Sequence, residues 1–148
     1  MKYRVLFICT HNSARSQMAE AFLNYIYGER FDAFSAGTHP GVLNSYVVKV
    51  MSEKGIDISQ NKTKSVEEFR GKKFDYVVTV CDRAREECPY FPGALQQIHK
   101  GFDDPSAFTG EENEVLAKVR KLRDEIEMWV RETFSEENTS ATKSPFFD

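Results

Sequence analysis

The sequence has 148 residues, of which 41% are hydrophobic and 29% charged, and this length and balance predict one globular domain. No apolar run approaches the ~18 residues of a membrane-spanning helix, and no segment has the pattern of a signal peptide. We therefore expect a cytoplasmic protein without a membrane partner. Its net charge of −3 lacks the basic excess of nucleic-acid binders, so we expect no nucleic-acid partner.

The first part of the chain predicts a strand followed by a helix. Residues 3–8 form an apolar run that is short enough to be a buried strand, and a polar turn follows it. Apolar residues then recur at the spacing of a helix that packs on a sheet, namely Met18, Phe22, Tyr25 and Ile26. Gly28 stands where a helix often ends in a left-handed residue.

The strand–helix pattern then repeats. Residues 33–36 predict a second strand. A second helical spacing follows at Leu43, Val47, Val50 and Met51, with Gly55 after its end. Residues 63–70 are polar and predict a loop with one short helical turn.

The last part of the chain predicts two more strands and a long helix. Residues 74–80 form a strong buried strand, and residues 96–99 form a weaker one. Thr109 and Glu112 have the spacing of a capping box, which predicts a helix start. The apolar face of this helix comprises Val115, Val119, Leu122, Ile126, Trp129 and Val130. Because the periodicity ends there, we expect one domain over residues 1–134 and a flexible tail over residues 135–148.

Strands that alternate with helices predict an α/β fold with a parallel sheet covered on both faces. Ligands of such sheets bind at the carboxyl ends of the strands. The loop of residues 9–16, with the sequence CTHNSARS, lies at such an end and leads directly into a helix. Its backbone N–H groups are therefore expected to form a cradle for a tetrahedral oxyanion.

The residues expected to bind this anion are Thr10, His11, Asn12, Ser13, Ala14, Arg15 and Ser16. At the base of the cradle, the N–H groups and the helix dipole predict a lowered pKa for Cys9 and a good nucleophile. Arg15 can hold two anion oxygens with its planar guanidinium, and Ser16 can donate its hydroxyl to the sulfur. The alternative is a buried cysteine beside a surface arginine, but the strand–loop–helix context favours the anion loop. The loop matches no nucleotide-binding pattern.

The two other cysteines predict chemistry rather than a structural framework. The three cysteines and three histidines are scattered, so we expect neither a disulfide framework nor a metal site. Cys81 follows the strand predicted at residues 74–80, which places its thiol at the same sheet edge as Cys9. If residues 82–87 are helical, Cys88 lies about 10 Å from Cys81 along the axis, and a disulfide requires the helix to unwind. The alternative is that both thiols are buried small hydrophobes.

The motifs resemble one known family. The pattern Cys9-x5-Arg15-Ser16, followed by QMAE at residues 17–20, resembles the low-molecular-weight protein tyrosine phosphatases and especially their thioredoxin-coupled arsenate reductase branch. The segments SAGTHP at residues 35–40, CPYFP at 88–92 and HKGFDDP at 99–105 are similar to that branch as well. The resemblance implies a three-layer α/β/α fold with a four-stranded parallel sheet.

The resemblance also implies a reaction with arsenate as the substrate. Cys9 attacks arsenic while Asp104 acts as the general acid, although Asp-Pro is also a frequent turn opener. Cys81 then attacks Cys9 and releases arsenite, and Cys88 attacks Cys81. Thioredoxin reduces the resulting Cys81–Cys88 disulfide, and no bound organic cofactor is needed. Phosphate and sulfate are expected competitors for the cradle.

Two other functions remain open at this point. A low-molecular-weight protein tyrosine phosphatase would use a Cys9 phosphoenzyme with Arg15 and Asp104, without requiring Cys81 or Cys88. A non-catalytic oxyanion-binding protein would leave three positioned thiols unexplained.

The sequence departs from the family pattern at two positions. His11 stands where relatives commonly have glycine, and we expect its side chain to point outward. Some relatives hold potassium near the positions of Asn12, Glu20 and Ser35, with an acid from a later loop. This chain has Lys64 in that loop without the acid, so the Lys64 ammonium is expected to replace the ion.

Overall fold

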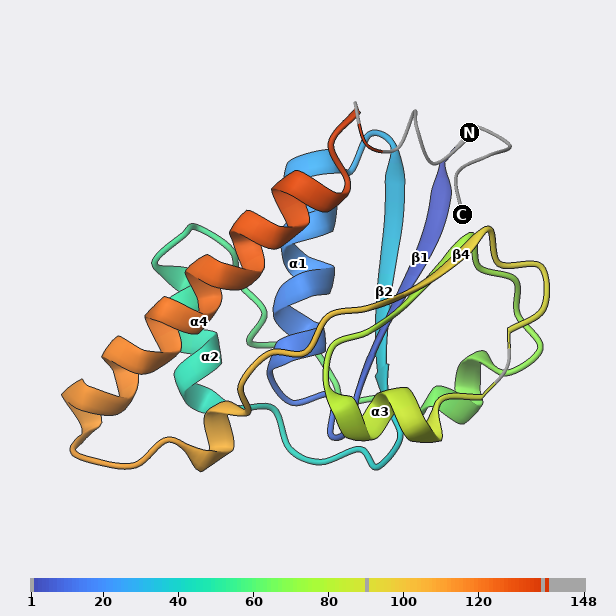
Figure 1. Cartoon of the computed structure of the whole chain (residues 1–148). Helices are drawn as coiled ribbons and strands as arrows, with labels where there is room; N and C mark the ends of the chain where they lie inside the picture. The colour runs from blue at the N-terminus through green and yellow to red at the C-terminus, as the bar shows by residue number, and fades with distance from the viewer. Residues whose placement is uncertain (1, 90, 137, 139–148) are drawn as a thin grey trace.

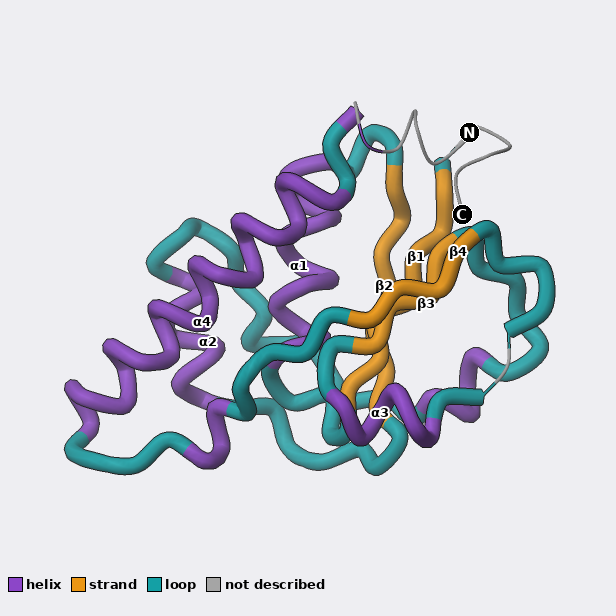
Figure 2. Tube along the Cα trace, in the orientation of Figure 1, coloured by secondary structure: helices purple, strands orange, loops and turns teal. Residues whose placement is uncertain are grey.

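The protein is described by a computed structural model that covers residues 2–89, 91–136 and 138. Its strands are β1 (Tyr3–Cys9), β2 (Phe31–Gly37), β3 (Tyr76–Thr79) and β4 (Gln96–His99). Its α-helices are α1 (Arg15–Tyr27), α2 (Ser45–Ser52), α3 (Asp82–Glu87) and α4 (Glu112–Thr133), and its two short 3₁₀ helices are η1 (Val66–Phe69) and η2 (Pro105–Ala107). The strands form one parallel sheet in the order β2-β1-β3-β4, as Figure 2 shows.

Three layers surround this sheet. Helix α1 packs on β1 and β2, and α4 packs on α1 and α2, so these three helices cover one face (Figure 1). The segments that contain η1 and α3 cover the other face, where four aromatic rings contact one another, those of Phe34, Phe69, Phe74 and Phe91. The expected three-layer α/β/α architecture with four parallel strands is confirmed.

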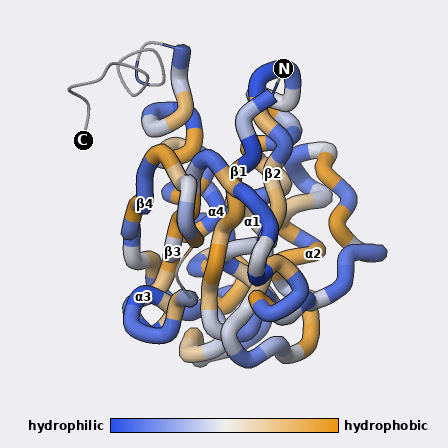
Figure 3. The backbone as a smooth tube through the Cα atoms, turned by 90° about the vertical axis from the view of Figure 1, so that its right-hand side faces the viewer, coloured by the Kyte–Doolittle hydropathy of each residue, from blue (hydrophilic) through white to orange (hydrophobic). Residues whose placement is uncertain are grey.

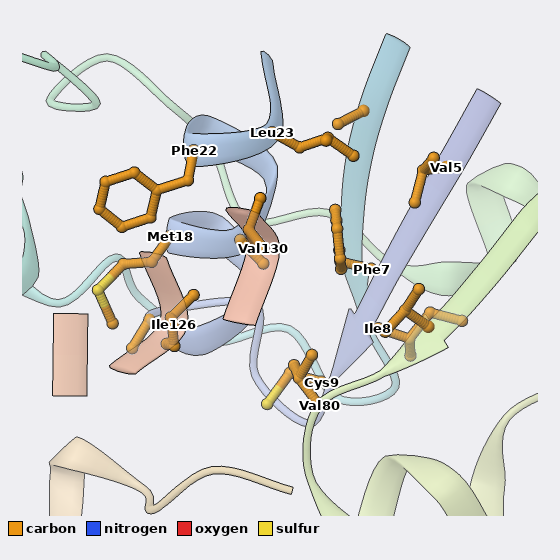
Figure 4. Close-up of a cluster of buried hydrophobic side chains, with 14 of the residues drawn as sticks. Val5, Phe7, Ile8, Cys9, Met18, Phe22, Leu23, Val80, Ile126 and Val130 are labelled. Atoms are coloured by element: carbon orange, nitrogen blue, oxygen red, sulfur yellow. The ribbon is translucent and has the colours of Figure 1, made fainter. Parts of the chain in front are cut away.

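The central strand β1 is buried because both faces of the sheet are covered. Val5, Leu6, Phe7 and Ile8 have no solvent exposure. Figure 4 shows Val5 and Phe7 on the side of α1 and α4, whereas Ile8 points the other way. A continuous apolar run without alternation is the pattern that such a strand requires.

The predicted helix faces are only partly right. The buried face of α1 includes Met18, Phe22 and Leu23, but Tyr25 is 65% exposed. The reason is that the sheet and α4 contact α1 from two directions, and neither covers Tyr25 in the last turn. In α2 the predicted residues Val47, Val50 and Met51 are buried, whereas Leu43 precedes the helix. The predicted face of α4 is buried except that Trp129 remains half-buried.

Two predicted helix ends are wrong. Gly28 has right-handed backbone geometry, with φ −60°, because the hydrogen bond from Arg30 N to Tyr27 O closes an ordinary turn into β2. The capping box of α4 is formed by Glu111 and Glu114, not by Thr109 and Glu112. Gly110 lies between Thr109 and Glu111, and its φ of 125° turns the chain there. The N-cap of α4 is therefore Glu111 and not Thr109.

The short loop and strand predictions agree with the structure. Residues 63–70 contain η1, and the fourth strand has the predicted bounds. The third strand is shorter than predicted, because regular pairing covers only Tyr76–Thr79. Helix α4 ends against the buried Phe134, and most of the predicted tail, residue 137 and residues 139–148, lies outside the described residues. Within the described part of the chain, no helix is long and apolar enough to cross a membrane.

Candidate active site

The loop of residues 9–16 joins the carboxyl end of β1 to the start of α1, and Asn12 fixes its shape. Asn12 has φ 55°, a left-handed conformation that asparagine tolerates better than most residues. Its side-chain Nδ2 donates to Ser16 Oγ at 2.8 Å and to Ser35 Oγ at 2.9 Å. Its Oδ1 accepts from Lys64 N at 2.9 Å and from Gln17 Nε2 at 3.2 Å. The buried Asn12 therefore ties the loop to α1, β2 and the segment before η1.

The end of β2 supports the same loop from behind. The N–H groups of Thr38 and His39 donate to the carbonyls of Cys9 and Thr10, at 3.1 and 2.7 Å. A Cβ atom on Gly37 would lie 2.7 Å from Thr10 O, so only glycine allows the two backbones to approach this closely. The predicted segment 35–40 is thus the support of the cradle.

Arg15 is buried and held by contacts with residues 102 and 104. Its side chain is only 9% exposed, its Nη1 donates to Phe102 O at 3.1 Å, and its Nη2 lies 3.6 Å from Asp104 Oδ2. Its Nε is buried and has no hydrogen-bond partner among the described residues. A buried guanidinium N–H without a partner is costly, and an oxyanion in the loop would supply the acceptor.

Asp104 lies at a turn, which is one of the two roles that the sequence left open, and it also faces Arg15. It is the N-cap of η2, where its Oδ1 accepts from the backbone N and the hydroxyl of Ser106 at 2.9 and 2.8 Å. Its other oxygen faces Arg15. Burial by itself raises the pKa of Asp104, but the Ser106 hydrogen bonds and the Arg15 charge outweigh it and hold that pKa below its usual value.

Cys9 and Cys81 meet at the carboxyl ends of β1 and β3, and they form a hydrogen bond between their side chains. Thr10 Oγ1 lies 3.2 Å from Cys81 Sγ and adds a second contact. The hydrogen bond from Cys9, aided by Thr10, lowers the pKa of Cys81 to about 5 despite partial burial. The same hydrogen bond between the two side chains, together with burial, raises the pKa of Cys9 well above its usual range. The pKa values of the two thiols are therefore coupled, with that of Cys81 lowered and that of Cys9 raised.

The prediction of a lowered pKa for Cys9 is thus wrong for this geometry. The sequence predicted that the two thiols lie at one sheet edge, but it did not show that their pKa values are coupled. The Ser16 hydroxyl accepts a hydrogen bond from Asn12 Nδ2. Among the described residues, it makes no hydrogen bond to the sulfur of Cys9.

Cys88 is held apart from the other two thiols. Cys81 is the N-cap of α3 and Cys88 its C-cap, so the predicted intervening helix is present. Cys88 is half-buried, its Sγ donates to Pro89 O at 3.3 Å, and burial raises its pKa to about 11. All three cysteines are free.

The polar residues around the cradle fall into an inner and an outer set. His11 is exposed, as expected, and its Nδ1 lies 2.8 Å from His39 O. Inside, Asn12, Ser35 and Glu20 form a chain of hydrogen bonds. Burial raises the pKa of Glu20, against the Ser35 hydrogen bond and the charge of Lys64. Lys64 Nζ donates to Lys62 O at 3.2 Å.

The sequence reasoning missed two contributors to the site. Gln17 has no exposed surface, and its Nε2 donates to Asn12 O at 3.1 Å and to Lys62 O at 3.0 Å. Thr10 was expected only to bind the anion, yet its hydroxyl contacts Cys81. A polar residue inside the QMAE motif on the buried helix face was the available signal for Gln17. Among the described residues, no three His, Cys, Asp or Glu side chains are grouped to hold a metal ion.

Comparison with known proteins identifies the fold family. Residues 4–141 match the family described as low molecular weight phosphotyrosine protein phosphatase. The chain belongs to this family. A relative from Halalkalibacterium halodurans, named arsenate reductase, is 40% identical over 132 residues, which cover 89% of this chain and 94% of the relative.

Solved structures of the same fold agree with this membership in the low-molecular-weight phosphatase family. An arsenate reductase in the phosphate binding state has a TM-score of 0.72 at 26% identity, covering 89% of this chain and 95% of its own. The thioredoxin-dependent arsenate reductase of Corynebacterium glutamicum has a TM-score of 0.68 at 30% identity, covering 94% of this chain and 63% of its own.

Proposed function

We propose that this member of the family reduces arsenate to arsenite by a relay of Cys9, Cys81 and Cys88, with thioredoxin as the electron donor. The observation that carries the proposal is the hydrogen bond between Cys9 and Cys81 beside the anion loop. A phosphatase needs a single nucleophilic thiol there, whereas a reductase needs a second one to remove the oxidised product. The name of the relative at 40% identity supports the same reaction.

Arsenate is proposed to bind in the cradle of residues 9–16, with Arg15 Nε and Nη2 as ligands of its oxygens. The buried Nε without a partner supports this assignment. Phosphate and sulfate have the same tetrahedral shape and are expected to compete, and the phosphate-bound structure of a relative is consistent with such binding.

In the first step, Cys9 Sγ attacks arsenic, an As–S bond forms, and one arsenate oxygen leaves as water. The proton of Cys9 passes to the Cys81 thiolate, to which it is already hydrogen-bonded. Asp104 donates a proton to the leaving oxygen. Its pKa is low beside Arg15, but a bound arsenate occupies the guanidinium and places negative charge nearby, and both effects raise that pKa.

In the second step, Cys81 passes its proton to an oxygen of the departing arsenic group and attacks Cys9 Sγ. A Cys9–Cys81 disulfide forms, the As–S bond breaks, and its electron pair remains on arsenic, which leaves as arsenite. Cys88 then attacks Cys81 Sγ, a Cys81–Cys88 disulfide forms, and Cys9 is released as a thiolate. Thioredoxin supplies the two electrons that reduce this disulfide, so the chain requires no bound organic cofactor. Thioredoxin and the three free thiols are consistent with a cytoplasmic location.

The test is arsenate-dependent oxidation of NADPH in the presence of thioredoxin and thioredoxin reductase. The wild-type chain should consume NADPH, and both Cys81→Ser and Cys88→Ser should abolish turnover. Hydrolysis of p-nitrophenyl phosphate, measured in parallel, should persist in both variants because it uses Cys9, Arg15 and Asp104 and requires no attack by Cys81 or Cys88. Phosphate ester hydrolysis without arsenate-dependent NADPH consumption would instead identify a phosphatase acting through a Cys9 phosphoenzyme.

A further inference from the structure

Two histidines hold the two ends of α3, the helix that separates Cys81 from Cys88. Asp82 is the first residue of α3, and its Oδ1 lies 2.9 Å from His99 Nε2. Glu87 is the last residue, and its Oε1 lies 2.9 Å from His39 Nε2. Each end of the helix is therefore connected to a different part of the molecule.

Both histidines are themselves fixed in place. His99 belongs to β4, and its Nδ1 lies 2.8 Å from Thr79 Oγ1 in β3. His39 follows β2, its backbone N donates to Thr10 O at 2.7 Å, and its carbonyl lies 2.8 Å from His11 Nδ1. The first connection leads to the sheet and the second to the anion loop, so all three histidines of the chain take part.

Helix α3 is short, and its other side-chain ion pair among the described residues is internal, between Arg83 Nε and Glu87 Oε2 at 3.2 Å. It has six residues, and isolated helices shorter than about 12 residues are marginal in water. Ala84 is its one buried residue. Figure 3 shows the segment in hydrophilic colours, in contrast to the neighbouring strand β3. Contacts from outside the helix must therefore account for much of its order.

The state of α3 decides whether Cys81 and Cys88 can bond. An intact helix separates their positions by about 10 Å along its axis, whereas a disulfide needs Cα atoms within about 7 Å. Asp82 is adjacent to Cys81, so the His99 contact can persist when the helix unwinds. Glu87 is adjacent to Cys88, so the His39 contact must break before Cys88 can move.

We propose that His39 and His99 are positioning residues that hold the two ends of α3 and keep Cys88 away from Cys81 in the reduced protein. The His99–Asp82 contact acts as the fixed end, and the His39–Glu87 contact acts as the end that is released. This inference rests on the proposed function, because it concerns the same Cys81–Cys88 disulfide.

The test measures the equilibrium between the Cys81–Cys88 dithiol and its disulfide in the full chain carrying Cys9→Ser. The buffer contains reduced and oxidised glutathione. Two thiols lose two electrons and two protons to form the protein disulfide, and one oxidised glutathione becomes two reduced molecules. Acid quenching, alkylation of free thiols and mass measurement give the equilibrium constant without any need for arsenate or thioredoxin.

His39→Ala should raise this equilibrium constant about two- to five-fold, the range expected when one exposed ion pair that favours the helix is lost. His39 is exposed, so the variant should fold, and an unchanged urea midpoint of the reduced protein would confirm that the effect is local. The same substitution in a Glu87→Gln background should have no further effect. Glu86→Gln is the matched control, because it makes the same charge change on α3 at a residue that does not contact His39.

A second pair of variants tests the fixed end in the same way. His99→Ala should leave the equilibrium constant close to that of the parent chain, with Asp82 or with Asp82→Ala, because the His99–Asp82 contact persists when α3 unwinds. An equilibrium constant that His39→Ala leaves unchanged, or that His99→Ala raises as much as His39→Ala does, would overturn the proposal, while leaving the relay intact. If the parent Cys9→Ser chain forms no Cys81–Cys88 disulfide in any glutathione buffer, the relay itself fails.

Discussion

The proposed chemistry of the site depends on the contact between Cys9 and Cys81. The hydrogen bond between the two thiols lowers the pKa of Cys81 to about 5, and the contact from Thr10 supports it. In the proposed relay, Cys9 gives up its proton to Cys81 in order to attack. Cys81 then acts first as the base for Cys9 and later as the nucleophile toward it.

Substitution of Cys9 is therefore expected to change the titration of Cys81. In the Cys9→Ala variant, the thiolate of Cys81 loses its strongest hydrogen bond, so its pKa should rise above the value of about 5. The far-ultraviolet absorbance of the thiolate, followed against pH, measures this shift. If the titration midpoint of Cys81 is the same in the wild type and in Cys9→Ala, the two thiols are not coupled.

Lys64 is the residue whose charge is expected to stand in for a potassium ion. Burial raises the pKa of Glu20, which accepts a hydrogen bond from Ser35, and the charge of Lys64 opposes this rise. Lys64→Ala should reduce thermal stability in sodium chloride and recover part of it in potassium chloride at equal ionic strength. Strong activation of the wild type by potassium, with no difference in Lys64→Ala, would show that Lys64 has no such role.

At the scale of elements, the anion loop is shaped by its contact with the end of β2. Asn12 does not explain the conformation of the loop alone, since the N–H groups of residues 38, 39 and 41 also donate to carbonyls of the loop. Gly37→Ala places a Cβ atom 2.7 Å from the backbone oxygen of Thr10, and the loop must shift. We expect phosphate affinity, measured by calorimetry, to fall at least tenfold, which corresponds to about 1.4 kcal/mol of binding free energy.

Gly41→Ala is the matched control for this prediction. Its added Cβ would lie 3.3 Å from the side chain of the exposed His11, which can move. Phosphate affinity should therefore change little in Gly41→Ala. Equal losses in the two variants would mean that the close approach of Gly37 to Thr10 does not shape the cradle.

The sequence predicted the elements better than their ends. Apolar runs located β1 and β3 clearly, because a strand buried on both faces needs a continuous run, whereas β2 and β4 were predicted from a shorter and a weaker signal. Helix ends depend on turn geometry, and the predictions at Gly28 and Thr109 failed for that reason. The predicted strand ends placed Cys9 and Cys81 at one edge of the sheet. The direction in which the pKa of Cys9 shifts depends on a contact between side chains, which the spacing of residues in the sequence does not reveal.

At the scale of the whole molecule, Phe134 closes the core where α4 ends. It is 1% exposed and makes edge-on ring contacts with Phe7, Phe31, Tyr76 and Trp129. These rings come from three different strands and from α4, so one side chain joins the sheet to the longest helix. The active-site edge of the sheet is at the opposite end of the strands, as Figure 1 shows.

Phe134→Ala should therefore destabilise the whole domain without altering the chemistry of the site. Loss of a buried phenylalanine costs about 3–5 kcal/mol, and urea unfolding measures it. The rate of arsenate reduction should stay near the wild-type value at temperatures where the variant is folded. Met128→Ala, in the same helix but 59% exposed, is the control and should change stability little. Similar unfolding free energies for both variants would refute the role of Phe134.

The most direct test of the relay follows one turnover in the Cys88→Ser variant. This protein is mixed with arsenate in the absence of any reductant, and arsenite and disulfides are then measured. We expect one arsenite per chain and a disulfide between Cys9 and Cys81. The reaction stops at this disulfide because the variant lacks the Cys88 thiol that would attack it. Release of no arsenite, or a chain in which Cys9 and Cys81 both remain free, would contradict it.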